Sequence, residues 1–275
     1  MKPNFLVIGA GKSGTTSLCA QLAQHPDVFI CEPKEPGFFD VRYHRGWSWY
    51  ESLFEPGRDC AARGEGTVRY SQVTLYPQVA PLIARDLPDA RLIYIVRHPL
   101  QRIESAWIER RALGMPDATR DFCETVRRHR GFIDASRYWM QINAYRDRFP
   151  DDKILVLFFE DYCENPHAVL RKCFAHLGVD ETVPIEDTGP QNVWTGKLVD
   201  GPAAETLRRV PGFAWLRDAV PDPVRLAFRR VIKRPLEERP VWEEATRRWA
   251  AEQLADDTRR FLEFYGKPAD FWTLP

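Results

Sequence analysis

Short apolar runs alternate along the first two-thirds of the chain with longer segments in which apolar residues recur every three or four positions. The runs predict buried strands, and the longer segments predict amphipathic helices. The strands are expected over 5–8, 28–30, 65–68, 91–96 and 153–159. The helices are expected over 15–24, 47–54, 76–86, 99–113, 138–148 and 166–177. Strands that alternate with helices are typical of a parallel α/β sheet.

The pattern changes after Gly178, where no strand-like run is visible and prolines and arginines are frequent. The chain ends in a long helical stretch over 241–265. We find no internal repeat, low-complexity segment or linker in the 275 residues. The sequence therefore predicts a single domain over 1–275, an α/β fold with a central parallel sheet flanked by helices. Its part from about 180 to 275 is expected to be mainly helical and to form a C-terminal cap.

Composition excludes several classes of protein. Hydrophobic residues make up 44% and charged residues 28%, which is the balance of an ordinary globular protein. The 39 basic residues equal the 39 acidic ones, so no nucleic-acid partner is expected. No apolar run approaches the roughly 20 residues that span a bilayer, and no signal peptide is recognisable, so we expect a cytoplasmic protein without a membrane span. Scattered cysteines and histidines predict neither a disulfide framework nor a metal site.

The segment from Gly9 to Ser17 joins the first predicted strand to the first predicted helix. At such a junction, backbone N–H groups and the helix N-terminus together bind anions. A lysine adds a mobile positive charge and hydroxyl side chains add donors. We expect one phosphate to be held by Lys12, Ser13, Gly14, Thr15, Thr16 and Ser17. A Walker A motif would need a glycine five residues before Gly11, where this chain has Leu6.

A second phosphate site is predicted where the strand over 91–96 ends. Arg97 follows that strand, and Ser105 lies under two turns into the next helix. A guanidinium binds two phosphate oxygens at once, so Arg97 and Ser105 are expected to grip one phosphate together. The strand does not end in an aspartate of the kind that organises magnesium in nucleotide hydrolases. Two separate phosphate sites without such a carboxylate argue against ATP as the ligand.

These motifs resemble those of a known family. Lys12-Ser-Gly-Thr-Thr-Ser17 resembles the 5′-phosphosulfate-binding loop of the sulfotransferases, and Arg97-His-Pro-Leu-Gln-Arg-Ile-Glu-Ser105 resembles their 3′-phosphate motif. The likeness is greatest to the heparan-sulfate-type branch and its bacterial relatives, with further matches at Lys34-Glu-Pro-Gly-Phe-Phe-Asp40 and Phe158-Phe-Glu-Asp161. It implies a P-loop-type fold and 3′-phosphoadenosine 5′-phosphosulfate (PAPS) as cosubstrate, with 3′-phosphoadenosine 5′-phosphate (PAP) as product and no metal.

The resemblance also assigns catalytic roles. In the heparan-type enzymes the glutamate three residues before the paired phenylalanines is the catalytic base, and Glu35 has that position here. A base within hydrogen-bond reach removes the acceptor's proton as the new bond forms. The loop lysine, here Lys12, is expected to stabilise the negative charge that develops on the leaving phosphate. Glu32 lies on the same loop as Glu35 and is the other carboxylate to test.

One family feature is missing. Some heparan-type enzymes carry a second lysine in a Glu-Lys-Ser/Thr segment, which here reads Glu65-Gly66-Thr67. Lys34 and His44 are candidates to supply that charge at the acceptor site. The lysine- and glycine-rich cofactor loop of animal members is also not recognisable, and Lys197 and Lys233 are candidate substitutes for it.

The expected function is in-line transfer of the PAPS sulfuryl group to a hydroxyl or amine of a carbohydrate or small-molecule acceptor. One alternative is a P-loop kinase that acts on a small molecule and needs ATP and magnesium. Another is a non-catalytic nucleotide-binding protein that keeps the fold, although the presence of both Lys12 and Glu35 argues against it. The sequence predicts neither the acceptor nor the oligomeric state.

Overall fold

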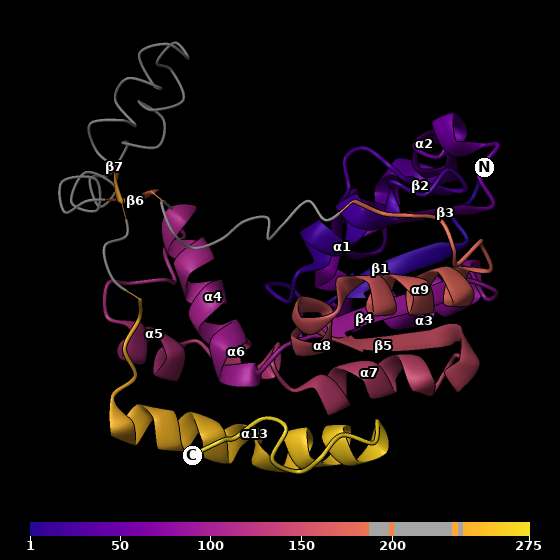
Figure 1. The fold of residues 1–275 in the computed structure, drawn as a ribbon. Coiled ribbons are helices and arrows are strands. Elements are labelled where there is room, and N and C mark those ends of the chain that lie inside the picture. Colours follow the sequence, from indigo (N-terminus) through magenta and orange to yellow (C-terminus); the bar gives the residue numbers. More distant parts are fainter. Residues whose placement is uncertain (187–197, 201–232, 236–238) are drawn as a thin grey trace, which may run out of the picture.

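The computed structural model describes residues 1–186, 198–200, 233–235 and 239–275. Its centre is a five-stranded sheet with the strand order β2-β3-β1-β4-β5, in which every neighbouring pair is parallel (Figure 1). The strands are β1 (Phe5–Gly9), β2 (Val28–Ile30), β3 (Ala62–Glu65), β4 (Arg91–Val96) and β5 (Ile154–Phe158). The predicted parallel sheet is confirmed. Because β1 lies between β3 and β4, the order reverses beside β1, where ligands bind in sheets of this kind.

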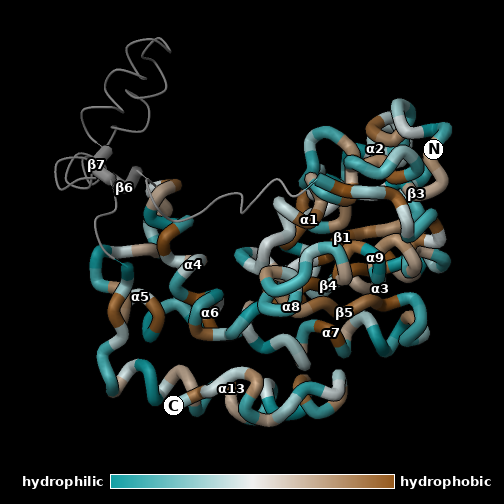
Figure 2. Tube along the Cα trace, in the orientation of Figure 1, coloured by the Kyte–Doolittle hydropathy of each residue, from teal (hydrophilic) through white to brown (hydrophobic). Residues whose placement is uncertain are grey.

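Successive residues of the central strands point to opposite faces of the sheet, and both faces are covered by helices. Phe5 and Val7 of β1 pack on one face, and Leu6 and Ile8 pack on the other. All four side chains are fully buried. Burial on both sides explains why the strand is a continuous apolar run rather than an alternating one. Figure 2 shows the same grouping of hydrophobic residues along the strands at the centre of the sheet.

The helices form layers on the two faces. One face carries α1 (Thr15–Leu22) and α9 (Pro166–Leu177), and α8 (Phe159–Glu164) leads into α9. The other face carries α2 (Gly46–Ser52), α3 (Val79–Asp86) and α7 (Tyr138–Arg146), together with the C-terminal part of α13 (Glu244–Phe264). Of the helices that the structure describes, none is both long and apolar enough to cross a bilayer.

A separate cluster stands beside the sheet. The helix α4 (Pro99–Ala112) follows β4 and packs with α5 (Phe122–Arg128), α6 (Gly131–Asp134) and the first part of α13. In Figure 1, α4 stands apart from the sheet, and α13 runs along the bottom from this cluster to α7. This arrangement leaves the carboxyl ends of β1 and β4 facing one side of α4.

Two expectations about strands were wrong. The third strand, expected over 65–68, is Ala62–Glu65. Its sequence has no apolar run, and its position is set by pairing with β1 and β2, in which Gly64 lies opposite both Phe5 and Ile30. A short antiparallel pair, β6 (Leu198–Asp200) and β7 (Lys233–Pro235), lies in the part where no strand was expected. The helix α3 also begins three residues later than the pattern predicted, at Val79.

Candidate active site

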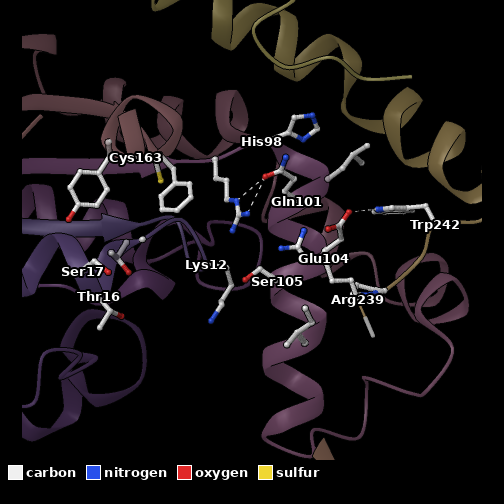
Figure 3. Close-up of a pocket in the computed structure, with 18 of the residues that line it drawn as sticks. Lys12, Thr16, Ser17, His98, Gln101, Glu104, Ser105, Cys163, Arg239 and Trp242 are labelled. Atoms are coloured by element: carbon white, nitrogen blue, oxygen red, sulfur yellow. Dashed lines mark hydrogen bonds between the residues drawn. The ribbon is translucent and has the colours of Figure 1, made fainter. Parts of the chain in front are cut away.

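A cavity of about 1000 Å³ lies between the carboxyl ends of β1 and β4, one face of α4 and the segment that leads into α13. Its wall contains seven of the eight residues predicted for cofactor binding, Lys12, Gly14, Thr15, Thr16, Ser17, Arg97 and Ser105. Figure 3 shows Thr16 and Ser17 toward one side of this cavity, Glu104 and Trp242 toward the other, and Lys12 between them. The two phosphate sites that the sequence predicts therefore open into one space.

The conformation of the glycine-rich turn requires glycine at position 14. Gly14 has a φ of 88°, and a Cβ there would lie 2.8 Å from the ring of Phe159. Glycine avoids both the strained backbone and the clash. The helix α1 begins at the next residue, so the first backbone N–H groups of its turn have no partner within the helix. Ser13 differs from the other predicted residues, because its side chain is fully buried and does not line the cavity.

Arg97 directly follows the last residue of β4, and its side chain lines the cavity. Its guanidinium lies 4.9 Å from the centre of the Phe159 ring, and its Nη2 donates to Oε1 of Gln101 at 3.1 Å. Ser105 follows Gln101 by one turn, so both lie on the face of α4 that lines the cavity. An arginine above an aromatic ring, on the same cavity wall as a serine hydroxyl eight residues later, is suited to bind an anion bidentately.

Lys12 is paired with a residue that the sequence did not single out. Its Nζ lies 3.0 Å from Oε2 of Glu109 on α4, and both side chains are partly exposed. The pair joins the glycine-rich turn to α4 across 97 positions of sequence. A carboxylate on this lysine competes with any anion that enters the cavity.

Glu109→Gln is therefore expected to tighten PAP binding, because the amide releases Lys12 and removes a negative charge from the anion site. A partly exposed ion pair contributes up to about 1 kcal/mol, which corresponds to at most about fivefold in affinity. Isothermal titration calorimetry with PAP measures the change, and Glu124→Gln on α5 is the control. Weaker PAP binding by Glu109→Gln would contradict this account of the ion pair.

The end of the cavity farthest from the glycine-rich turn combines basic and aromatic side chains with the carboxylates of Glu104 and Glu244. Arg239, Trp242 and Arg247 line it, and the indole N–H of Trp242 donates to Oε1 of Glu104 at 2.8 Å. Trp242 also packs edge-on against Phe122 at 4.6 Å between ring centres. These residues were not predicted, because no local pattern links Trp242 to Glu104, 138 positions earlier. Of the two lysines considered for this end, Lys197 lies outside the described residues, as does the side chain of Lys233.

The predicted base and acceptor residues do not line this cavity. Glu35 and Lys34 are half-buried in the loop after β2, whereas Glu32 and His44 are exposed. Oε1 of Glu35 lies 3.0 Å from Nζ of Lys34. The loop is tied to the segment after β3, since the backbone N–H of Gly66 donates to the carbonyl of Lys34 at 2.8 Å.

The segment after β3 also reaches the glycine-rich turn. A Cβ placed on Gly11 would lie 3.4 Å from the side chain of Val68, which is ordinary van der Waals contact. Gly66 thus bonds to the loop of Glu35, and Val68, two residues later, stands beside the turn of Lys12. Residues 66–68 therefore lie between the two loops.

A buried carboxylate anchors the loop that carries Glu35. Glu65, the last residue of β3, is fully buried, and its Oε1 accepts hydrogen bonds from Tyr50 at 2.8 Å and Tyr70 at 2.6 Å. Its Oε2 accepts bonds from the backbone N–H of Thr67 at 3.0 Å and from the Thr67 hydroxyl. That hydroxyl accepts in turn from the backbone N–H of Gly37 at 3.1 Å. The network therefore fixes the loop that carries Glu35.

Glu65 also predicts a pH dependence of stability. Burial raises the pKa of Glu65 to about 7, although its hydrogen bonds oppose the shift. The unfolded glutamate titrates near 4.3, so between about pH 4.5 and 7 the folded state holds a proton that the unfolded state has lost. This group thus makes the free energy of unfolding decrease as pH rises through that window, by up to about 1.4 kcal/mol per pH unit.

Glu65→Gln is expected to remove this contribution. Urea denaturation from pH 4.5 to 8 measures the free energy of unfolding of both proteins. That of the wild type should fall relative to that of the variant as pH rises. Glu51→Gln, at a partly exposed glutamate whose Oε2 lies 3.3 Å from the N-terminal ammonium of Met1, is the control. A difference that stays constant with pH would show that Glu65 does not hold the proton.

Glu160 and Asp161, which follow β5, have structural roles. Oε1 of Glu160 accepts from the backbone N–H of His98 at 2.8 Å, and both oxygens of Asp161 lie 2.7 Å from Nζ of Lys267. The first bond joins the ends of β4 and β5, and the second fastens the C-terminal segment to α8. Among the residues that the structure describes, no three His, Cys, Asp or Glu side chains are grouped as metal ligands.

Comparison with known proteins gives one consistent family. The sulfotransferase domain model matches residues 2–190. Heparan sulfate glucosamine 3-O-sulfotransferase 3B1 from Mus musculus is 30% identical over 190 residues, which cover 66% of this chain and 47% of that protein. The chain thus spans about half the length of the curated relatives it matches.

Solved structures share the fold. A sulfotransferase from Alicyclobacillus acidocaldarius has a TM-score of 0.71 and 23% identity, with 99% of each chain covered. Mouse sulfotransferase SULT7A1, solved in complex with PAP, has a TM-score of 0.53 and 16% identity, with 96% of this chain and 88% of that chain covered. Since the family model matches well over half of the sequence, the chain belongs to the sulfotransferase family, whose enzymes use PAPS.

Proposed function

We propose that this protein transfers the sulfuryl group of PAPS to a hydroxyl or amine of a carbohydrate or small-molecule acceptor. The observation that carries the proposal is the single cavity in which the glycine-rich turn and the Arg97–Ser105 pair share one wall. PAPS carries two anionic groups on its ribose, the 5′-phosphosulfate and the 3′-phosphate, and this cavity offers donors for both. The 5′-phosphosulfate would bind Lys12 and the start of α1, and the 3′-phosphate would bind Arg97 and Ser105.

The chemical step needs a base and a cation. The acceptor oxygen or nitrogen attacks sulfur, and Glu35 takes its proton as the new bond to sulfur forms. The bond between sulfur and the bridging phosphate oxygen breaks in line, and its electron pair stays on the phosphate of PAP. Lys12 stabilises that developing charge once it has left Glu109. The bond of Gly66 to the loop of Glu35, and the position of Val68 beside the glycine-rich turn, support a place for Glu35 near the Lys12 end of the cavity.

The acceptor class rests on the relatives. The relatives include enzymes named for a glucosamine of heparan sulfate, which favours a carbohydrate hydroxyl over other acceptors. Relatives also include a protein from Dictyostelium discoideum described as a membrane-associated sulfotransferase, 37% identical over 103 residues. A cytoplasmic location and a single domain over 1–275 stay predictions from the sequence.

Ligand-induced thermal shifts test this function against its alternatives. We expect PAP to raise the melting temperature, because ligands that bind only the folded state stabilise it. ATP with magnesium is expected to give a smaller shift. Stabilisation by ATP with magnesium alone would favour the kinase. Stabilisation by PAP without any transfer from PAPS to a panel of sugars, amines and phenols would favour the non-catalytic protein.

A further inference from the structure

The pair formed by Lys34 and Glu35 is more enclosed than an ordinary surface ion pair. Nζ of Lys34 lies 3.0 Å from Oε1 of Glu35, and the lysine side chain is only 20% exposed. The Nζ atom itself is buried and makes no hydrogen bond to the described residues, so its interaction with Glu35 is electrostatic. A lysine that withdraws its ammonium from water usually does so against a fixed anion, because desolvating an unpaired charge is costly.

The ammonium of Lys34 lies beside Gly66, where a residue with a side chain would crowd it. A Cβ placed on Gly66 would lie 3.2 Å from Cε of Lys34, 3.5 Å from its Nζ and 2.8 Å from Sγ of Cys19. Gly66 is not among the glycines with positive φ, so its backbone does not itself require glycine. A side chain at residue 66 would therefore clash first with Sγ of Cys19 and would then crowd the end of Lys34 beside it, and glycine avoids both.

The two partners are held on a rigid frame. The carbonyl of Lys34 accepts from the N–H of Gly66 at 2.8 Å, and the N–H of Gly37 donates to the Thr67 hydroxyl at 3.1 Å. Both bonds connect the loop of Glu35 to the segment after β3, which Glu65 anchors in the core. A charge fixed on such a frame can set the direction of a neighbouring carboxylate.

We propose that Lys34 is the positioning residue for Glu35 and that Gly66, which has no side chain, leaves room for the Lys34 ammonium. The ammonium holds Oε1 of Glu35 and leaves Oε2 to accept the acceptor's proton. Lys34 thus acts through the carboxylate, and it contributes to turnover rather than to PAPS binding. This inference rests on the proposed function, in which Glu35 is the base.

Lys34→Met tests the role, because methionine keeps the length of the chain and removes the charge. We expect kcat for transfer of sulfur-35 from labelled PAPS, to the best acceptor in a sugar and amine panel, to fall by about ten- to a hundredfold, as misplaced catalytic groups do. KM for PAPS, PAP affinity and the melting temperature should stay as in the wild type. Lys172→Met, on the exposed side of α9, is the matched control.

Supplying the positive charge from residue 66 instead of residue 34 tests the role of the space beside Gly66. Cys19→Ala removes the sulfur that a Cβ at residue 66 would meet. In the Cys19→Ala background, Lys34→Ala is expected to lower kcat. Adding Gly66→Lys to that double variant should raise kcat again by about tenfold, because it brings an ammonium back beside Glu35. As a second route that needs no new side chain, ethylammonium should restore turnover of Lys34→Ala in a saturable way. Tetramethylammonium, which cannot donate a hydrogen bond, should not.

The outcomes separate this inference from the function on which it rests. Turnover of Lys34→Met within about twofold of the wild type, beside an inactive Glu35→Gln, would overturn the role of Lys34 alone. Folded variants that neither Gly66→Lys nor ethylammonium restores would overturn it as well. Wild-type protein that transfers nothing from PAPS would instead overturn the proposed function.

Discussion

Glu35→Gln is expected to lower kcat for sulfuryl transfer by about two to four orders of magnitude, the usual contribution of a positioned general base. The amide has nearly the shape of the carboxylate but does not accept a proton at neutral pH. Because Glu35 lies in a loop outside the cavity wall, PAP affinity should hardly change, whereas the melting temperature should fall slightly, since the amide leaves the buried ammonium of Lys34 without its carboxylate. Steady-state kinetics with sulfur-35-labelled PAPS, together with calorimetric titration of PAP, measure the two effects separately.

The control lies on the same loop. Glu32 is exposed, and Glu32→Gln is expected to keep the wild-type turnover. A fully active Glu35→Gln with an inactive Glu32→Gln would move the base to Glu32. If both variants stayed active, general-base catalysis by this loop would have to be abandoned.

Arg97→Ala is expected to weaken binding of PAP by about 10- to 150-fold, because a hydrogen bond to a charged group contributes roughly 1.5–3 kcal/mol. Affinity for adenosine 5′-phosphosulfate should be unchanged, since that ligand has no 3′-phosphate. Ser105→Ala removes an uncharged donor and should give a smaller loss in the same direction, of about 0.5–1.5 kcal/mol. Calorimetric titration of each variant with both nucleotides provides the comparison.

Arg171→Ala, at an exposed position of α9, controls for the loss of a positive charge from the surface. Equal losses for PAP and adenosine 5′-phosphosulfate in Arg97→Ala would mean that Arg97 holds the 5′ end or only the fold. In that event, Arg239 and Arg247 at the far end of the cavity would become the next candidates for the 3′-phosphate.

Most of the sheet could be predicted because its central strands are buried on both faces. The continuous apolar runs of β1, β4 and β5 follow from that burial. The strand β3 was misplaced for the opposite reason, because Ala-Arg-Gly-Glu has no apolar pattern and its register depends on pairing with β1 and β2. The pattern did not predict α5 and α6 either, since these short helices depend on packing against α4 and α13.

The candidate site divides in the same way. Residues that follow a strand closely, such as Lys12 and Arg97, could be predicted, because strand ends in a parallel sheet meet at one edge. Ser13 belongs to the same motif, yet its side chain turns into the core, and which hydroxyl of a turn faces outward is not visible in the sequence. Glu109, Trp242 and the position of Lys34 beside Gly66 depend on contacts between distant segments, which no local pattern records.

Transfer of sulfur-35 from labelled PAPS by the wild-type protein, with EDTA present, tests the central claim most directly. We expect labelled product from at least one sugar, amine or phenol acceptor, with one PAP released for each sulfuryl group transferred. A parallel reaction with γ-phosphorus-32-labelled ATP and magnesium should leave the acceptors unlabelled. Phosphorus label on an acceptor, with PAPS left intact, would contradict the assignment of this cavity to sulfuryl transfer.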